Sequence, residues 1–90
     1  KYSRQSIKFL NKQSEIITKE KAKEIILLSL RKFFLKNNMN IDLKKLRGKW
    51  KNYFRVRAGK VRIVFSIKKN KIVSVLVHCI DFRSNVYKLV

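Results

Sequence analysis

Apolar residues recur at helical spacing in the first part of the chain. Residues 18–36 place them every three or four positions, which predicts a helix. Its core face is expected to contain Ala22, Ile25, Ile26, Ser29, Leu30, Phe33 and Phe34. A shorter helix is predicted before it, with its cap near Ser3 or Ser6 and its end by about Gln13. Its apolar side is expected to contain Ile7, Phe9 and Leu10. The residues before the cap read as the end of a first strand, which is expected to be truncated at the N terminus.

From residue 53 the apolar period changes to two, which is the period of a strand. Residues 53–58 and 61–67 are predicted to form a hairpin around Gly59-Lys60, where the glycine suits the first position of a type II′ turn. This loop pairs residue 58 with 61, 57 with 62 and 55 with 64, and paired residues share a face. One face therefore receives Arg55, Arg57 and Arg62. The other receives an apolar row: Phe54, Val56, Ala58, Val61, Ile63, Phe65 and Ile67.

Two segments around the hairpin have no sustained period. Residues 39–49 are expected to form a basic connector, with Leu43 and Leu46 held against the core. Residues 68–71 are expected to form a second turn. Both segments read as connections rather than as strands.

The last part of the chain predicts one more strand and a polar tail. Residues 72–79 are β-branched and apolar on both faces, which is typical of a central strand covered on both sides. Within this run, His78 reads as a packed residue rather than as a catalyst. Arg83 and Tyr87 follow at a spacing of four and are expected to reach the same edge of the sheet. Tyr87 either stacks on an unpaired base and bonds a phosphate, or closes the core.

Composition narrows the class of protein. Ninety residues, 46% hydrophobic and 32% charged, suffice for a single domain spanning 1–90 with one modest core. Lysine and arginine number 24 against five acids, which gives a formal charge of +19. This excess favours a polyanionic partner, with nucleic acid ahead of an anionic membrane surface. The basic run Lys44, Lys45, Arg47, Lys49 and Lys51 is either a solvated surface or a patch that binds an RNA backbone.

Several kinds of site are not expected. Cys79 is the only cysteine and cannot form an internal disulfide, which fits a packed strand residue in a reducing cytoplasm. No Cys/His cluster has metal-ligand spacing, and two glycines do not make a Gly-rich phosphate loop. No apolar run approaches the roughly 18 residues of a membrane span. We therefore expect a cytoplasmic protein without a metal or a small-molecule cofactor.

The three arginines of the hairpin face need an explanation. Like charges directly across two strands, as predicted for Arg57 and Arg62, repel by up to about 1 kcal/mol. One interpretation is a solvated face on which the side chains extend into water. The other is a phosphate-binding surface, because guanidinium groups stay protonated and bind oxyanions through two parallel hydrogen bonds.

The ordered motifs of the second half resemble a known family. Leu46-Arg47-Gly48, the stretch from Arg55 to Gly59, Arg62 and the closing Arg83 and Tyr87 together are similar to the RelE/ParE superfamily of bacterial and archaeal toxins, in its RelE-like branch. The resemblance covers nearly the whole chain. It implies an α+β fold in which two N-terminal helices pack on one face of a small antiparallel β-sheet.

This resemblance also implies a function. RelE-like toxins of type II toxin-antitoxin systems are ribosome-dependent mRNA interferases, in which an mRNA 2′-hydroxyl in the ribosomal A site attacks the adjacent phosphate without a metal. The residues that match catalytic positions are Arg55, Arg57, Arg62, Arg83 and Tyr87. The implied partners are the ribosome, mRNA and a cognate antitoxin protein that covers the basic surface.

The resemblance leaves alternatives open. Arg55 stands where some relatives carry lysine, and Phe82 stands where many carry histidine. The general acid and base are therefore unassigned, with Lys45, Tyr87 and Asp81 as candidates, because arginine is a poor base. The other branch of the superfamily shares the fold but inhibits DNA gyrase, and a third possibility is a non-catalytic nucleic-acid-binding relative.

Overall fold

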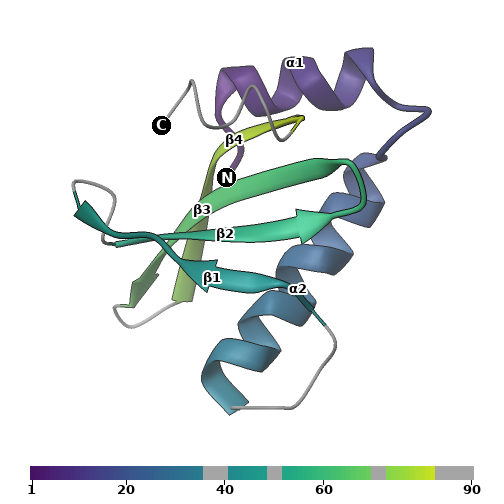
Figure 1. Cartoon of the computed structure of the whole chain (residues 1–90). Helices are drawn as coiled ribbons and strands as arrows, with labels where there is room; N and C mark the ends of the chain where they lie inside the picture. Colours follow the sequence, from purple (N-terminus) through teal and green to yellow (C-terminus); the bar gives the residue numbers. More distant parts are fainter. Residues whose placement is uncertain (36–40, 49–51, 70–72, 83–90) are drawn as a thin grey trace.

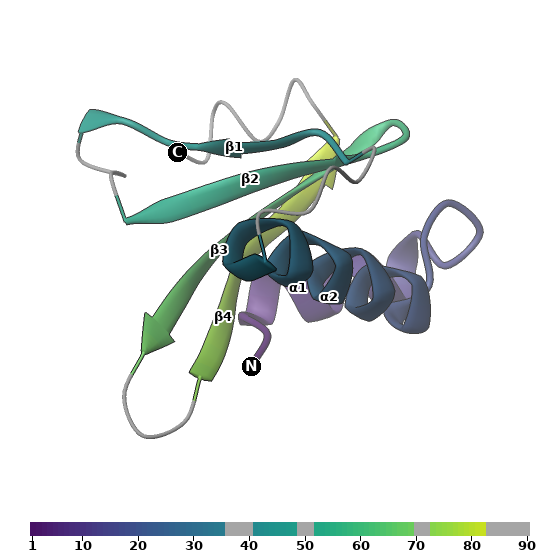
Figure 2. The same cartoon turned by 90° about the horizontal axis from the view of Figure 1, so that it is seen from below.

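The computed structural model describes residues 1–35, 41–48, 52–69 and 73–82. Its elements are α1 (Arg4–Lys12), α2 (Lys19–Leu35), β1 (Leu43–Lys45), β2 (Tyr53–Ala58), β3 (Val61–Lys69) and β4 (Val73–Phe82). The strands form one antiparallel sheet in the order β1-β2-β3-β4 (Figure 1). Both helices lie on the same side of this twisted sheet, so within the described ranges its other face carries no helix (Figure 2). The predicted α+β class is confirmed.

The hairpin has the register that its short loop predicts. Ala58 pairs with Val61 and Arg57 pairs with Arg62. Gly59 has φ +61°, a conformation that a primed turn requires at its first position and that glycine adopts without a steric penalty. Because the register is fixed, the alternation of arginine and apolar side chains also divides the two faces as predicted.

Local hydrogen bonds fix where the helices begin and end. Ser3 caps α1 by accepting a hydrogen bond from the Ser6 backbone N–H at 3.2 Å, and Gln13 ends the helix. Thr18 caps α2 in the same way through the Lys21 N–H at 3.0 Å. Both helices therefore match their predicted ranges to within a residue at the ends that the structure describes. In the described part of the chain, neither helix combines the length and the apolar composition that crossing a bilayer requires.

The hydrophobic core lies between the helices and the sheet. It contains Phe9, Leu10, Ile17, Ala22, Ile26, Phe54, Val56, Val61, Ile63, Phe65, Val77 and Ile80. Three of the predicted core positions differ: Ile7 is 45% exposed, and Phe33 and Phe34 are 37% and 38% exposed near the end of α2. Phe33 lies at the core boundary, because its ring contacts Phe54 edge-on at 4.9 Å. The apolar stripe of each helix is thus narrower than the sequence pattern indicates.

Two predictions about the sheet are wrong. Leu43–Lys45, expected in a connector, is an edge strand that pairs with β2. The strand predicted over 72–79 was expected to be central, but it is β4 (Val73–Phe82), the last strand of the four-stranded order, and Leu76 is 42% exposed. Lys1 to Ser3 lie along its outer edge, where Tyr2 bridges to Val77. The predicted turn at 68–71 falls partly outside the described residues, and β3 extends through Lys69.

Candidate nucleic-acid interface

A row of four charged residues crosses the helix-free face of the sheet. Arg57 on β2 pairs with Arg62 on β3, and Arg62 pairs with Asp81 on β4. On the other side, the Arg57 backbone N–H donates to the Asp42 carbonyl at 3.0 Å. The order across the sheet is therefore acid, arginine, arginine, acid. The two like charges stand at the centre, and each carboxylate stands at a flank.

The next row contains the third arginine. Arg55 pairs with Lys44 on β1 and with Val64 on β3. Its Nη1 lies 3.4 Å from Asp42 Oδ2, which is an ion-pair distance, although the contact lacks hydrogen-bond geometry. Partial removal from water opposes ionisation of Asp42, but the charge of Arg55, aided by Lys44 and Arg57, outweighs it and holds the pKa of that carboxyl below its usual range.

Two of the three arginines are buried. Arg62 is 5% exposed and Arg55 is 7% exposed, whereas Arg57 is exposed to solvent. The Nε of Arg62 has no hydrogen-bond partner among the described residues. A buried polar atom without a partner costs on the order of 1 to 3 kcal/mol. The solvated-face interpretation therefore fits Arg57 but not Arg55 or Arg62.

A small apolar cluster lies on the same face as the buried arginines. Val64 and Cys79 are buried on this face, with Leu46 and Tyr53 packed against them. The predicted packing of Cys79 is confirmed, and burial, with a smaller contribution from the charge of Asp81, raises the pKa of its thiol to about 11. A thiol in this state is a packing group rather than a nucleophile.

An irregularity in β4 shapes the same face. The register shifts at Val64 and Phe65, which pair with Cys79 and Val77, so His78 is an extra residue. The ring of His78 packs edge-on against Tyr53 with centroids 5.3 Å apart. Its carbonyl accepts a hydrogen bond from the Ser3 hydroxyl at 2.7 Å, which fixes the cap of α1 to the bulge. His78 is therefore packed, as predicted, at one end of the arginine face.

The basic run predicted to bind RNA begins along the edge of the sheet. Lys44, Lys45 and Arg47 are exposed on or just after β1. Lys44 shares the face of Arg55, while Lys45 pairs with Phe54 and belongs to the opposite row. The run is thus split by the strand between two faces. Four other candidate residues lie outside the described residues: Lys49, Lys51, Arg83 and Tyr87.

The structure brings in residues that sequence reasoning did not place in the site. Asp42 was not a candidate, because residues 39–49 were expected to form a connector and the pairing of β1 with β2 was not predicted. Asp81 was named only as a possible proton-transfer group, and its position across from Arg62 depends on the register of β4. A sheet order with β1 beside β2 would have revealed the four-residue row. No group of three metal-ligating residues occurs within the described ranges.

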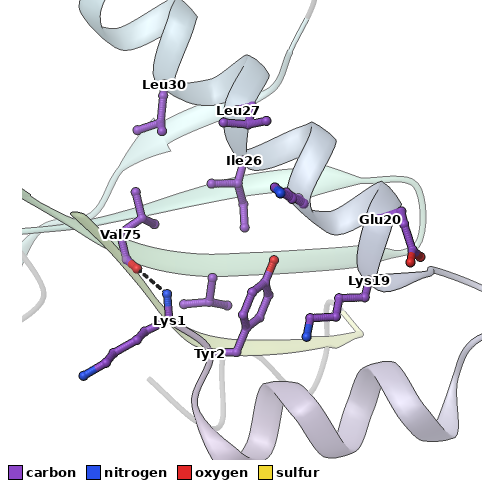
Figure 3. Close-up of a pocket in the computed structure, with 10 residues that line it drawn as sticks. Lys1, Tyr2, Lys19, Glu20, Ile26, Leu27, Leu30 and Val75 are labelled. Carbon is purple, nitrogen blue, oxygen red and sulfur yellow. Dashed lines mark hydrogen bonds between the residues drawn. The ribbon is translucent and has the colours of Figure 1, made fainter. Parts of the chain in front are cut away.

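A separate groove of about 580 Å³ lies away from the arginine face, between α2, the N-terminal residues and β4 (Figure 3). Its floor is aliphatic and includes Ile26, Leu30 and Val75. Lysines and Glu20 share its rim, and Lys19 Nζ lies 5.7 Å from the centre of the Tyr2 ring. Its aliphatic floor makes it a poor match for a phosphate backbone.

The sequence matches no protein-family model and no curated protein. The fold is similar to a solved structure, the RelB–RelE antitoxin–toxin complex from Methanococcus jannaschii. The likeness covers 98% of this chain and 95% of that chain, with a TM-score of 0.59 and 20% sequence identity. At this identity it shows the fold, and it agrees with the predicted helices on one face of an antiparallel sheet.

Proposed function

We propose that this protein is the toxin of a toxin-antitoxin pair and a ribosome-dependent mRNA endoribonuclease. The fold likeness to a RelB–RelE complex supports this class of protein, and the formal charge of +19 supports an RNA partner. The proposed catalytic residues are Arg55, Arg57, Arg62, Arg83 and Tyr87. A cognate antitoxin would cover the same basic face when the toxin is inactive.

The observation that carries the proposal is the environment of Arg62. Its guanidinium is buried, its Nε is unpartnered within the described structure, and the like charge of Arg57 stands directly across from it. An RNA phosphate would supply the missing acceptor and offset the repulsion between the two central charges of the row. The incompletely bonded guanidinium of Arg62 in the free protein would then be a preformed recognition site for the phosphate.

The arrangement suits a phosphoryl transfer in which the protein mainly positions and stabilises charge. The mRNA 2′-oxygen forms a bond to phosphorus while the bond from phosphorus to the 5′-oxygen breaks. The products are a cyclic phosphate and a 5′-hydroxyl, so one proton leaves the attacking oxygen and one reaches the departing oxygen. Arg57 and Arg62 would stabilise the charge that develops on the phosphoryl oxygens. Neither can act as the base, because guanidinium stays protonated.

The chain's own features favour the toxin over the antitoxin. A closed core between two helices and a four-stranded sheet supports an independently folded domain. An antitoxin that neutralises such a cationic surface is expected to carry the complementary negative charge, whereas this chain has only five acids. The antitoxin is therefore proposed as a separate, acidic partner.

A translating extract tests the proposal. The purified protein is added to ribosomes that translate a defined mRNA, and new 5′ ends are mapped by primer extension beside a reaction without ribosomes. We expect cuts at A-site codons only when ribosomes are present. An Arg31→Met variant serves as the matched control for charge loss, because Arg31 is exposed on α2, on the side of the sheet opposite the arginine face.

The failure of this assay would be informative. Intact mRNA together with trapped gyrase–DNA cleavage complexes would replace the RNA proposal with gyrase inhibition. Intact mRNA and unaffected gyrase, combined with RNA binding, would leave a non-catalytic binding protein. Cuts that also appear without ribosomes would retain the nuclease but contradict its dependence on the ribosome.

A further inference from the structure

A second basic groove lies between α1 and the end of β4. It has a volume of about 610 Å³ and is lined by Arg4, Lys8 and Lys12 together with Gln5, Phe9, Gln13, Asp81 and Phe82. The three cations are all exposed to solvent. Among the described residues that line it, Asp81 is the only carboxylate. The groove of Figure 3 likewise combines three lysines with one acid, Glu20, so the α1 groove differs from it in position and in the apolar floor, not in charge.

The cations form a regular series along α1. Arg4, Lys8 and Lys12 follow one another at intervals of four residues, so they lie on the same side of the helix. Successive members are separated by about 6 Å along the helix axis. One strand of a stacked nucleic acid carries a charge every 3.4 Å or so, which brings every second phosphate to roughly this spacing. The series therefore matches the periodicity of a phosphate backbone.

The groove is held in a fixed position relative to the sheet. The Gln5 side chain donates to the Ile80 carbonyl at 2.8 Å and accepts from the Ile80 N–H at 3.0 Å, so it pairs with the outer edge of β4. The rings of Phe9 and Phe82 pack edge-on with centroids 5.3 Å apart. Together with the Ser3 cap, these contacts prevent α1 from sliding along β4. The three cations are thus presented by a rigid support.

Asp81 connects this groove to the arginine face. It lines the groove, and it is also the cross-strand neighbour of Arg62. Its Oδ1 accepts from the Phe82 N–H at 2.8 Å and its Oδ2 accepts from Gln5 at 3.3 Å, so the carboxylate is engaged within the fold. An RNA strand that runs from Arg62 across β4 would reach this groove next.

We propose that the α1 groove is a second binding site for the phosphate backbone of an RNA strand that also occupies the arginine face. The inference rests on the proposed function for the identity of the RNA, and it adds where the strand continues. Arg4, Lys8 and Lys12 bind phosphates and take no part in the chemistry. The groove consequently contributes to affinity only for an RNA long enough to extend beyond the arginine face.

The test compares two triple variants with the same loss of charge. Arg4→Gln/Lys8→Gln/Lys12→Gln removes the groove cations, and Lys19→Gln/Lys23→Gln/Arg31→Gln removes one arginine and two lysines from exposed positions on α2. Binding of single-stranded RNAs of about 4 and about 16 nucleotides, a range that spans known single-strand site sizes, is measured by fluorescence anisotropy at several salt concentrations.

For the long RNA, loss of three phosphate contacts should reduce the slope of log K against log salt by about 2, and the α2 variant should change it by less than half as much. For the short RNA, the two variants should give the same slope. Equal slopes for both variants with the long RNA would overturn the inference. Lys8→Gln alone, expected to reduce the slope by about 0.7, provides the same comparison if the triple variant does not fold.

The outcome can be separated from that of the proposed function. A slope difference without ribosome-dependent cleavage by the wild-type protein would retain the groove and remove the interferase. Cleavage without a slope difference would retain the interferase and remove the groove. Each result comes from a different assay on the same purified proteins.

Discussion

The two faces of the sheet are built from alternate residues of the same strands, yet they differ in what their burial achieves. On the helix side, Ile63 and Phe65 are fully buried among other apolar side chains, and their removal from water stabilises the fold. On the other face, Arg55 and Arg62 are nearly as buried, but they are charged and incompletely bonded. Burial on one face therefore supports folding, while burial on the other leaves charged groups incompletely bonded, which is the state that the proposed phosphate would complete.

The largest expected effect lies on the helix side. Phe65→Ala should reduce the free energy of unfolding by about 3 to 5 kcal/mol, because it removes a fully buried ring that stacks near Phe54. Urea denaturation followed by circular dichroism measures this loss. Leu76→Ala, at an exposed position of β4, is the control and should cost under about 1 kcal/mol. Similar losses for the two variants would contradict the location of the core.

On the arginine face, a substitution is expected to leave the free energy of unfolding unchanged or to raise it. Arg62→Met keeps the aliphatic volume and removes the buried charge, so the free energy of unfolding should stay the same or rise by up to about 4 kcal/mol. Cleavage in the ribosome assay should be lost. A destabilisation larger than about 1 kcal/mol would mean that the guanidinium is satisfied in the free protein, and the contrast between the faces would fail.

The buried thiol of Cys79 should make the stability of the fold sensitive to alkaline pH. Its folded pKa of about 11 lies above that of an unfolded thiol, so its contribution to stability is complete below the unfolded pKa and is lost as pH rises through the folded pKa. The loss should be on the order of 2 kcal/mol between about pH 9 and pH 11. Because lysines and tyrosines titrate in the same range, the readout is the difference between wild type and Cys79→Ala. A pH-independent difference would refute this account.

Asp42→Asn should cause the smallest change in stability, and this change should depend on acidic pH. Since its folded pKa is depressed, its contribution is present above the unfolded pKa and is lost as pH falls through the folded value. Wild type should therefore be slightly more stable than Asp42→Asn at neutral pH, and the two should converge as pH falls below the folded pKa of Asp42. The carboxylate is well exposed, so the difference at neutral pH should also shrink in high salt. A constant gap from neutral to acidic pH would show that the contact with Arg55 is not electrostatic.

How much of the structure the sequence predicts depends on how far apart in the sequence the contacting residues are. The hairpin follows from the two-residue loop at Gly59, which fixes the pairing of Arg57 with Arg62 without information from elsewhere. The helices follow from their caps and their period. These features are local, and the structure confirms them.

Features that depend on distant neighbours were not predictable. The three residues of β1 are too few to show a period, and they become a strand only because β2 offers a free edge. The run in β4 is apolar on both sides because one face meets the helices and the other meets the cluster around Val64. The burial of Arg55 and Arg62 likewise requires side chains from several strands. Alternation placed the arginines on one face but did not show that two of them are withdrawn from water.

The most direct test of the account is the primer-extension assay on translating ribosomes with wild type, Arg62→Met and Arg31→Met in parallel, after urea denaturation has shown that each is folded. The account predicts ribosome-dependent cuts for wild type and Arg31→Met, and none for an Arg62→Met variant at least as stable as wild type. Undiminished cutting by folded Arg62→Met would contradict the assignment of the arginine face as the active surface.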